Sequence, residues 1–321
     1  MRALVGLLVC AALGAVARAD DSSAALAMGG IVFTHGTAVR MAAEDLYVSP
    51  KAVRIRFVFT NDTDKDVDTI VAFPLPDIDE NEFSESPLGT ITQDAVNFVG
   101  FKAAVDGKPV PFAVERRAFY KGKDVTAVLN AAGAPLNALS ETKAFDAIAG
   151  AKRQALLAAD LVDEESGDGL HPHWLLRTKF YWPQRFPAHK SVVIEHSYQP
   201  VTGQFFFDKN AVADKTLTKD QDYCFDAPTK ARLTAMAAAR LQAKADNGAY
   251  LNAYTTDYIL KTANNWNGPI GRFHLTLDKL KPGNALSLCW DGDLKKTGPT
   301  TFEAVRENFA PARDIHMLVL E

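Results

Sequence analysis

The chain has 321 residues, with 35 Lys and Arg against 39 Asp and Glu, which gives a formal net charge of -4. Hydrophobic residues make up 47% and charged residues 23% of the sequence, a balance typical of a folded globular protein and not of a disordered one. The net negative charge also argues against nucleic acid as a partner, because nucleic-acid-binding domains are normally strongly basic.

The first 19 residues have the pattern of a secretory signal peptide. Arg2 precedes an apolar stretch over residues 3–16, and Ala17-Arg18-Ala19 has the small-x-small form of a cleavage site. The apolar stretch is too short to span a bilayer comfortably, and no later stretch reaches the roughly 18 apolar residues of a membrane helix. We therefore expect cleavage after Ala19, export, and no transmembrane segment in the mature chain.

The sequence contains three cysteines. Cys10 lies inside the predicted signal peptide, so Cys224 and Cys289 remain after cleavage. Two cysteines in an oxidising compartment most simply pair with each other. We therefore predict a disulfide between Cys224 and Cys289.

The segment 20–117 is predicted to be an N-terminal part resembling a β-sandwich. Residues 53–59 place Val, Ile and Phe on one strand face and Arg on the other, as a half-buried strand requires. The alternation resumes at residues 67–73 and stops at Pro74-Leu75-Pro76, because proline donates no hydrogen bond to a strand ladder. Asp106-Gly107 predicts a two-residue hairpin turn, and the prolines that follow it place the second strand at a sheet edge.

The segment 118–170 is rich in Ala, Leu, Lys and Glu, and predicts a helical insertion. Phe119, Val125 and Leu129 fit one apolar helical stripe, and Ser140 is a candidate cap for a second helix.

The segment 171–321 returns to strand-like alternation, with one helix predicted from about residue 227 to 245. Strands and helices thus occur in separate blocks and do not alternate as β-α units. We therefore predict a mainly β fold with helical insertions (α+β), built from one or two antiparallel layers that resemble a β-sandwich.

The common catalytic and nucleotide-binding motifs are absent from the sequence: the G-x-S-x-G nucleophile elbow, H-E-x-x-H and the P-loop. The best metal candidate is His171-Pro172-His173, although alternating strand residues point to opposite faces, so one ion would require a bend at the proline. His189 or His196 could complete such a site only if the fold gathers them. We favour the alternative that His171 and His173 are ordinary surface histidines, and that His196, which shares a strand face with apolar residues, is a core histidine. No cofactor is predicted.

The acidic run Asp77–Glu82 begins like a calcium-binding loop, with carboxylates at alternating positions. The match then fails, because Glu82 stands where the sharp turn requires glycine and Leu88 stands where a bidentate glutamate belongs. We favour a solvated acidic loop.

The loop over residues 262–271 combines three asparagines, a tryptophan, two glycines and a proline. Asn264, Asn265, Trp266 and Asn267 are candidates for a ligand or partner surface on this loop. The alternative, which we favour, is an elaborate connection with Trp266 as a buried plug.

Phe205, Phe206 and Phe207 follow one another in a predicted strand. Because strand residues alternate between two faces, they cannot all enter one core. At least one must pack on a second layer or be exposed. Phe206 is the candidate for a partner surface, with core packing as the favoured alternative.

Several short motifs after the signal peptide carry a family resemblance. They are residues 20–24, Gly29-Gly30, Glu44-Asp45-Leu46, Val48-Ser49-Pro50, Phe73-Pro74-Leu75-Pro76-Asp77, the loop 262–271 with Phe273 and Leu275, and Phe309-Ala310-Pro311 before Asp314. Together they resemble the family of domain of unknown function 4424, found in secreted bacterial proteins, over nearly the whole mature chain. The resemblance implies a periplasmic or secreted bacterial protein. It implies no activity, and no catalytic residue is carried over. Residues 53–130 also resemble, more weakly, the β-sandwich module of inter-alpha-trypsin inhibitor heavy chains.

Two functional hypotheses follow from the sequence. The favoured one is a non-enzymatic periplasmic binding or protein-interaction module, whose partner is an envelope protein, a lipid or a glycan. The alternative is a secreted hydrolase or metalloprotein in which His171, His173 and one of His189 or His196 converge with a carboxylate.

Overall fold

The structure is a computed structural model that describes residues 22–27, 30–33, 38–80, 92, 94–165, 169–207, 223–242 and 250–321. The predicted signal peptide, the last two residues of the acidic run (Asn81 and Glu82) and Leu88 lie outside these residues.

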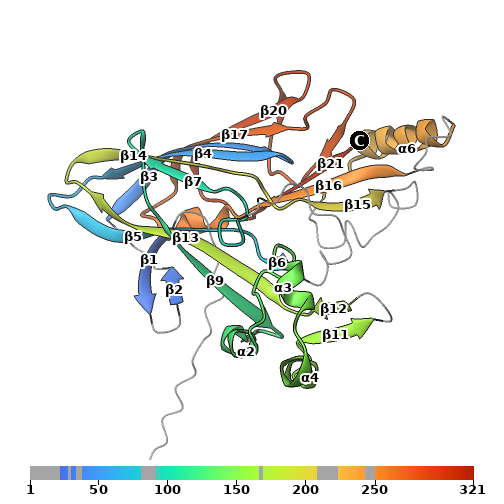
Figure 1. The fold of residues 1–321 in the computed structure, drawn as a ribbon. Coiled ribbons are helices and arrows are strands. Elements are labelled where there is room, and N and C mark those ends of the chain that lie inside the picture. The colour runs from blue at the N-terminus through green and yellow to red at the C-terminus, as the bar shows by residue number, and fades with distance from the viewer. Residues whose placement is uncertain are drawn as a thin grey trace, which may run out of the picture.

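Two large sheets form the body of the molecule (Figure 1). The eight-stranded sheet has the order β19 (Lys295–Lys296), β20 (Thr301–Phe309), β17 (Ile270–Asp278), β3 (Val39–Ser49), β4 (Ala52–Asn61), β14 (Lys190–Tyr198), β7 (Lys102–Val105) and β8 (Lys108–Pro109). The seven-stranded sheet has the order β10 (Lys123–Asp124), β9 (Ala113–Tyr120), β13 (Leu175–Phe186), β5 (Val67–Pro74), β1 (Ser22–Ala27) and β2 (Gly30–Phe33), with β6 (Ile78–Asp79) also paired to β13.

Two smaller sheets complete the strands of the described part. A four-stranded sheet has the order β15 (Gly203–Phe207), β16 (Leu251–Tyr258), β21 (Ile315–Leu320) and β18 (Ala285–Ser287), and β11 (Val162–Glu165) pairs with β12 (Gly169–Pro172). β17 runs parallel to β3, and the other described pairs are antiparallel. The prediction of a mainly β fold with helical insertions is therefore confirmed.

The main core lies between the two large sheets and is aromatic. Phe59 of β4 meets Phe186 of β13 with ring centroids 5.7 Å apart, and Phe101 stacks on Phe180 at 4.1 Å. Every one of these four rings is at most 2% exposed. Because burying a phenylalanine contributes about 1.5–3 kcal/mol, this double layer of rings is a main source of stability.

Strands from the first and the second half of the chain are neighbours within the same sheets. In the eight-stranded sheet, β3 and β4 pair with β17 and β14, and in the seven-stranded sheet β5 pairs with β13. The predicted segments 20–117 and 171–321 thus contribute strands to the same two sheets. The Asp106-Gly107 turn joins β7 to β8 with positive φ at both residues (49° and 74°), and β8 is an edge strand, as predicted.

The helices α2 (Thr126–Ala132), α3 (Thr142–Asp146) and α4 (Gly150–Ala158) lie with β11 and β12 beside β9 and β13 (Figure 1). Phe119 belongs to strand β9, which corrects its assignment to a helical stripe: it pairs with Leu175 in a sheet whose long-range hydrogen bonds override the local apolar pattern. Helix α3 begins after Glu141 without a side-chain cap, so Ser140 does not cap it.

The helix α6 (Ala227–Gln242) packs on the four-stranded sheet, away from the other helices (Figure 1). Leu233 and Ala237 of α6, together with Phe207, Leu251 and Leu318, form a second small core. The predicted disulfide between Cys224 and Cys289 is present, and it ties the residues before α6 to the segment just after β18. Within the described ranges, none of the helices combines the length and the hydropathy that crossing a bilayer would take.

Candidate functional site

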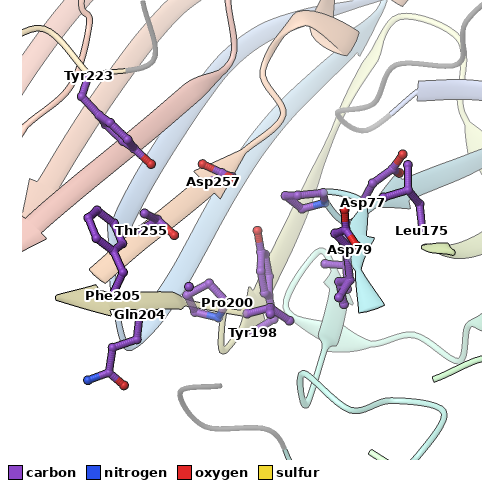
Figure 2. Close-up of a pocket in the computed structure, with 15 residues that line it drawn as sticks. Asp77, Asp79, Leu175, Tyr198, Pro200, Gln204, Phe205, Tyr223, Thr255 and Asp257 are labelled. Atoms are coloured by element: carbon purple, nitrogen blue, oxygen red, sulfur yellow. The ribbon is translucent and has the colours of Figure 1, made fainter. Parts of the chain in front are cut away.

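A cavity of about 460 Å³ lies where the four-stranded sheet meets the edge of the seven-stranded sheet (Figure 2). Its walls come from β6 and the loop before it, the first residue of β13, the end of β14, β15, β16, and Tyr223. The volume falls within the range of small-molecule sites in proteins. Residues widely separated in the sequence thus converge on one concave surface.

One wall of the cavity is acidic. It is formed by the segment around β6, which follows the proline-containing end of β5. The N–H of Leu75 still donates to the carbonyl of Thr178 at 2.9 Å, which keeps the chain beside β13. In the short strand that follows, Ile78 is buried. Asp77 and Asp79, on either side of it, share the opposite face and line the cavity. The guanidinium of Arg177 donates to Asp77 from outside the lining, at 2.8 Å.

A third carboxylate, Asp257 of β16, lines the cavity across from β6 (Figure 2). Asp257 and His316 are directly opposite each other in the ladder between β16 and β21. The Nδ1 of the imidazole lies 2.9 Å from Oδ1 of Asp257, so an N–H at that position donates to the carboxylate. The pairing holds the Asp257 side chain in place at the cavity wall.

Three aromatic rings form the remaining walls. Tyr198 is 5% exposed and packs against Phe73 with ring centroids 5.6 Å apart (Figure 2). Phe205 of β15 and Tyr223 lie on the other side, next to Thr255. The site therefore combines apolar ring surfaces with hydroxyl and carboxylate groups.

The disulfide accounts for the position of Tyr223. Cys224, the next residue, is bonded to Cys289, and its carbonyl accepts a hydrogen bond from Oγ of Ser287 at 3.0 Å. Both contacts attach the backbone on the C-terminal side of Tyr223 to the four-stranded sheet. The ring is thereby placed over the cavity.

A second, more open groove of about 790 Å³ crosses the outer face of the eight-stranded sheet. Four of its residues, Glu195, Arg56, Asp45 and His274, are successive partners in a cross-strand row. Arg56 and His274 lie 3.8 Å and 3.4 Å from Asp45. Asp45 is thus paired within this groove, Arg54 stacks on the Tyr47 ring at 3.7 Å, and we take the smaller cavity as the candidate site.

Glu80, immediately after β6, is fully buried and not part of a solvated loop. Burial raises the pKa of Glu80 to about 8, although the backbone N–H groups of Leu139 and Ala138 act in the opposite direction. The N–H of Leu139 donates to Oε2 at 3.2 Å, and the N–H of Glu80 donates to the carbonyl of Trp174 at 3.1 Å. Glu80 therefore connects the acidic wall of the cavity to the helical insertion.

The loop over residues 262–271 lies elsewhere. Trp266 is 3% exposed, with its ring 4.4 Å from that of Phe59, and Asn265 is also buried. Neither side chain can line an accessible surface, which corrects the candidate surface and agrees with the alternative of a buried plug. Asn264, which donates to the carbonyl of Pro311 at 2.9 Å, and Asn267 are exposed. A binding role for these two asparagines stays a prediction.

The phenylalanine triplet divides between two faces, as strand geometry requires. Phe207 is buried in the second core and Phe205 faces the cavity, whereas Phe206 is 69% exposed and lies 5.8 Å from the ring of Tyr250. The prediction that at least one ring is exposed is confirmed. The role of Phe206 in contacting a partner stays a prediction.

The candidate metal histidines do not converge. His196 is buried among the rings of Phe73 and Trp182, where burial lowers its pKa to about 3, while His189 lies beside Asp64 at 2.9 Å. No group of three His, Cys, Asp or Glu side chains that could hold a metal ion occurs in the part of the chain that is described. The geometry required by the histidine-based alternative is therefore not present among these residues.

His173 has a structural environment of its own. Its Nδ1 lies 3.0 Å from the carbonyl of Asp160 and its Nε2 lies 2.9 Å from the carboxylate of Asp163, and His171 is opposite Asp163 in the β11–β12 ladder. Burial by itself would lower the pKa of His173, but these two acceptors outweigh it and raise the pKa. Because both partners are acceptors, the ring is best satisfied when it is doubly protonated.

The sequence does not reveal that the carboxylates and the rings of the cavity belong to one site. Asp77 and Asp79 appear in the sequence only as an acidic run, and Asp257 lies in an ordinary strand pattern. One signal for the acidic wall is present in the sequence. Asp77 and Asp79 are two residues apart directly after a strand that ends in proline. Their convergence with β15 and β16 depends on the contact between sheets, which local periodicity does not encode.

The chain resembles the solved structure of a candidate nutrient-binding protein from Legionella pneumophila, with 15% sequence identity and a TM-score of 0.45 over 89% of this chain and 68% of that one. A comparison with curated proteins finds no match. The weaker similarity of residues 53–130 to inter-alpha-trypsin inhibitor heavy chains stays a prediction.

A family match covers nearly the whole chain. The sequence model of the family described as "Domain of unknown function (DUF4424)" matches residues 19–318. The chain therefore belongs to the DUF4424 family.

Proposed function

We propose that this protein is an exported, non-enzymatic binding protein whose ligand site is the cavity between β6 and β16. The observation that carries the proposal is the cavity itself, which has the volume of a small-molecule site and joins carboxylate, hydroxyl and aromatic groups from β6, β14, β15 and β16. A mixture of apolar walls and a few convergent polar groups is typical of sites that orient a small ligand.

Two observations support export to the periplasm. The sequence begins with the pattern of a signal peptide, and the Cys224–Cys289 disulfide belongs to an oxidising compartment. We expect the protein in the periplasmic fraction to begin at Asp20 when its intact mass is measured. A full-length chain of unchanged mass in the cytoplasmic fraction would contradict export.

The binding function is tested with the mature, disulfide-bonded protein and a panel of amines, sugars, amino acids and carboxylic acids in a thermal-shift assay. At least one class is expected to raise Tm, because a ligand that binds only the folded state stabilises it. Thr255→Phe fills the cavity and should abolish the shift. Phe206→Ser, on the opposite face of β15, is the matched control and should leave the shift unchanged. A panel that never raises Tm, or a shift that Thr255→Phe leaves intact, would contradict the proposal.

A further inference from the structure

We infer that the ligand is a small organic cation, an amine or quaternary ammonium compound, held between the Asp257 carboxylate and the aromatic rings of the cavity. The inference rests on the proposed function and specifies the chemical class that the same site selects.

The rings give the first argument. Tyr198, Phe205 and Tyr223 line the cavity, and Figure 2 shows the hydroxyl group of Tyr223 directed toward the space beside Asp257. Aromatic faces carry negative quadrupole charge and attract cations, more strongly where water is partly excluded. An anion would meet the same faces unfavourably.

The charges give the second argument. Asp77, Asp79 and Asp257 line the cavity, and the described lining includes no lysine or arginine. Arg177 contributes a guanidinium from outside the lining, but that group is directed to Asp77 at 2.8 Å. On the opposite wall, Asp257 lies beside an imidazole and not beside a permanent cation. A cleft lined by one sign of charge concentrates ligands of the opposite sign.

Asp257 is the best placed counter-ion for the cation. It projects from the middle of the site near Thr255 and the Tyr223 ring, whereas Asp77 lies at the far edge with Arg177 (Figure 2). Its hydrogen bond with His316 fixes one carboxylate oxygen, and the second oxygen is available to an ammonium group.

A neutral sugar is the competing ligand, because sugars also stack on rings and form hydrogen bonds with carboxylates. The two classes differ in their dependence on charge. Asparagine in place of Asp257 retains hydrogen-bonding capacity for a sugar but removes the attraction for a cation. Raising the salt concentration likewise weakens the binding of a cation and leaves that of a sugar nearly unchanged.

The experiment compares charged and uncharged ligands of the same shape by calorimetry. Choline is paired with its uncharged carbon isostere dimethylbutanol, and hexylamine is paired with hexanol; glucose and citrate represent sugars and anions. We expect at least one ammonium compound to bind about tenfold more tightly than its uncharged counterpart. Asp257→Asn and Tyr223→Leu should each weaken that binding about tenfold, or about 1.4 kcal/mol. Glu195→Gln, in the groove of the other sheet, is the control and should have no effect.

Each other outcome identifies which proposal fails. If a sugar, an anion or an uncharged isostere binds as tightly as the ammonium compounds, and Asp257→Asn has no effect, the cation inference is wrong while the binding function stands. If no compound binds, both are wrong. Asp79→Asn provides a second charge-removing variant should Asp257→Asn unfold, as judged from its circular dichroism.

Discussion

Glu80 is a fully buried carboxyl group whose pKa is raised to about 8 because burial disfavours its charged form. In the unfolded chain the same group titrates near its ordinary value of 4.5. Between these two values the folded state retains a proton that the unfolded state has lost. The contribution of Glu80 to stability is therefore fully present below about pH 4.5 and is lost as the pH rises to about 8.

Glu80→Gln should remove this dependence, because glutamine is uncharged at every pH and can still accept the hydrogen bond from Leu139. We expect the variant to exceed the wild type in free energy of unfolding at pH 8 by an amount on the order of a few kcal/mol. The two proteins should be nearly equal at pH 4. Urea unfolding across this range measures the difference, with the exposed Glu195→Gln as control. A constant difference at all pH values would contradict the buried neutral form of Glu80.

Trp266 is the second residue whose role the structure defines. Its ring meets Phe59 at 4.4 Å and Phe186 at 5.8 Å, so it closes the main core from the side of the loop. Trp266→Ala should reduce the free energy of unfolding by about 3–5 kcal/mol, as expected for a buried tryptophan. The neighbouring exposed Asn267→Ala should change it by less than about 0.5 kcal/mol. Chemical denaturation measures the free energy of unfolding of both variants. Equal losses in the two would contradict the role of Trp266 as a buried plug of the core.

At the scale of elements, strands and turns were predictable where the signal is local. The Asp106-Gly107 hairpin needs only residues that tolerate positive φ, and the strands β4 and β14 follow from period-two burial. The error at Phe119 arose because residues 113–120 pair with β13, some 60 positions later in the chain. The cavity could not be predicted for the same reason: β6 pairs with β13 and β15 pairs with β16, and the cavity arises where these two pairs meet in the tertiary structure.

The disulfide links the element scale to the site, since it fixes the segment between Tyr223 and α6. Replacing Cys224 and Cys289 by serine should lower the free energy of unfolding by as much as about 4 kcal/mol on the chain-entropy model. It should also weaken ligand binding, because the ring of Tyr223 loses its fixed position. Calorimetry on the double variant measures the affinity, and reduction of the wild type with a thiol should reproduce it. If the double variant and the reduced wild type both bind with unchanged affinity, contacts other than the disulfide hold the Tyr223 ring in position.

At the scale of the whole molecule, the two halves of the sequence are interleaved. β3 and β4 lie between β17 and β14, so strands from residues 39–61 are enclosed by strands from residues 190–198 and 270–278. Each half on its own would have unpaired strand edges. It would also contain only part of the aromatic core. The folding unit should therefore be the whole mature chain, in spite of the helical insertion that separates the halves in sequence.

Expression of fragments tests this conclusion. Residues 20–117 and residues 171–321, produced separately, should each lack a cooperative thermal transition. In the first fragment β4 and β5 would lose their ladder partners β14 and β13, and Phe59 would lose its contact with Phe186. Circular dichroism with a temperature scan measures the transition, and the mature chain is the control. A fragment that melted cooperatively would show that one half contains a complete core. Mixing the two fragments should restore binding only if the insertion 118–170, which carries the end of β9 with Ala118 and Phe119 of its ladder to β13, is supplied with one of them. The cavity depends on the same assembly, because Asp77 and Asp79 come from the first half while Asp257 and Tyr223 come from the second.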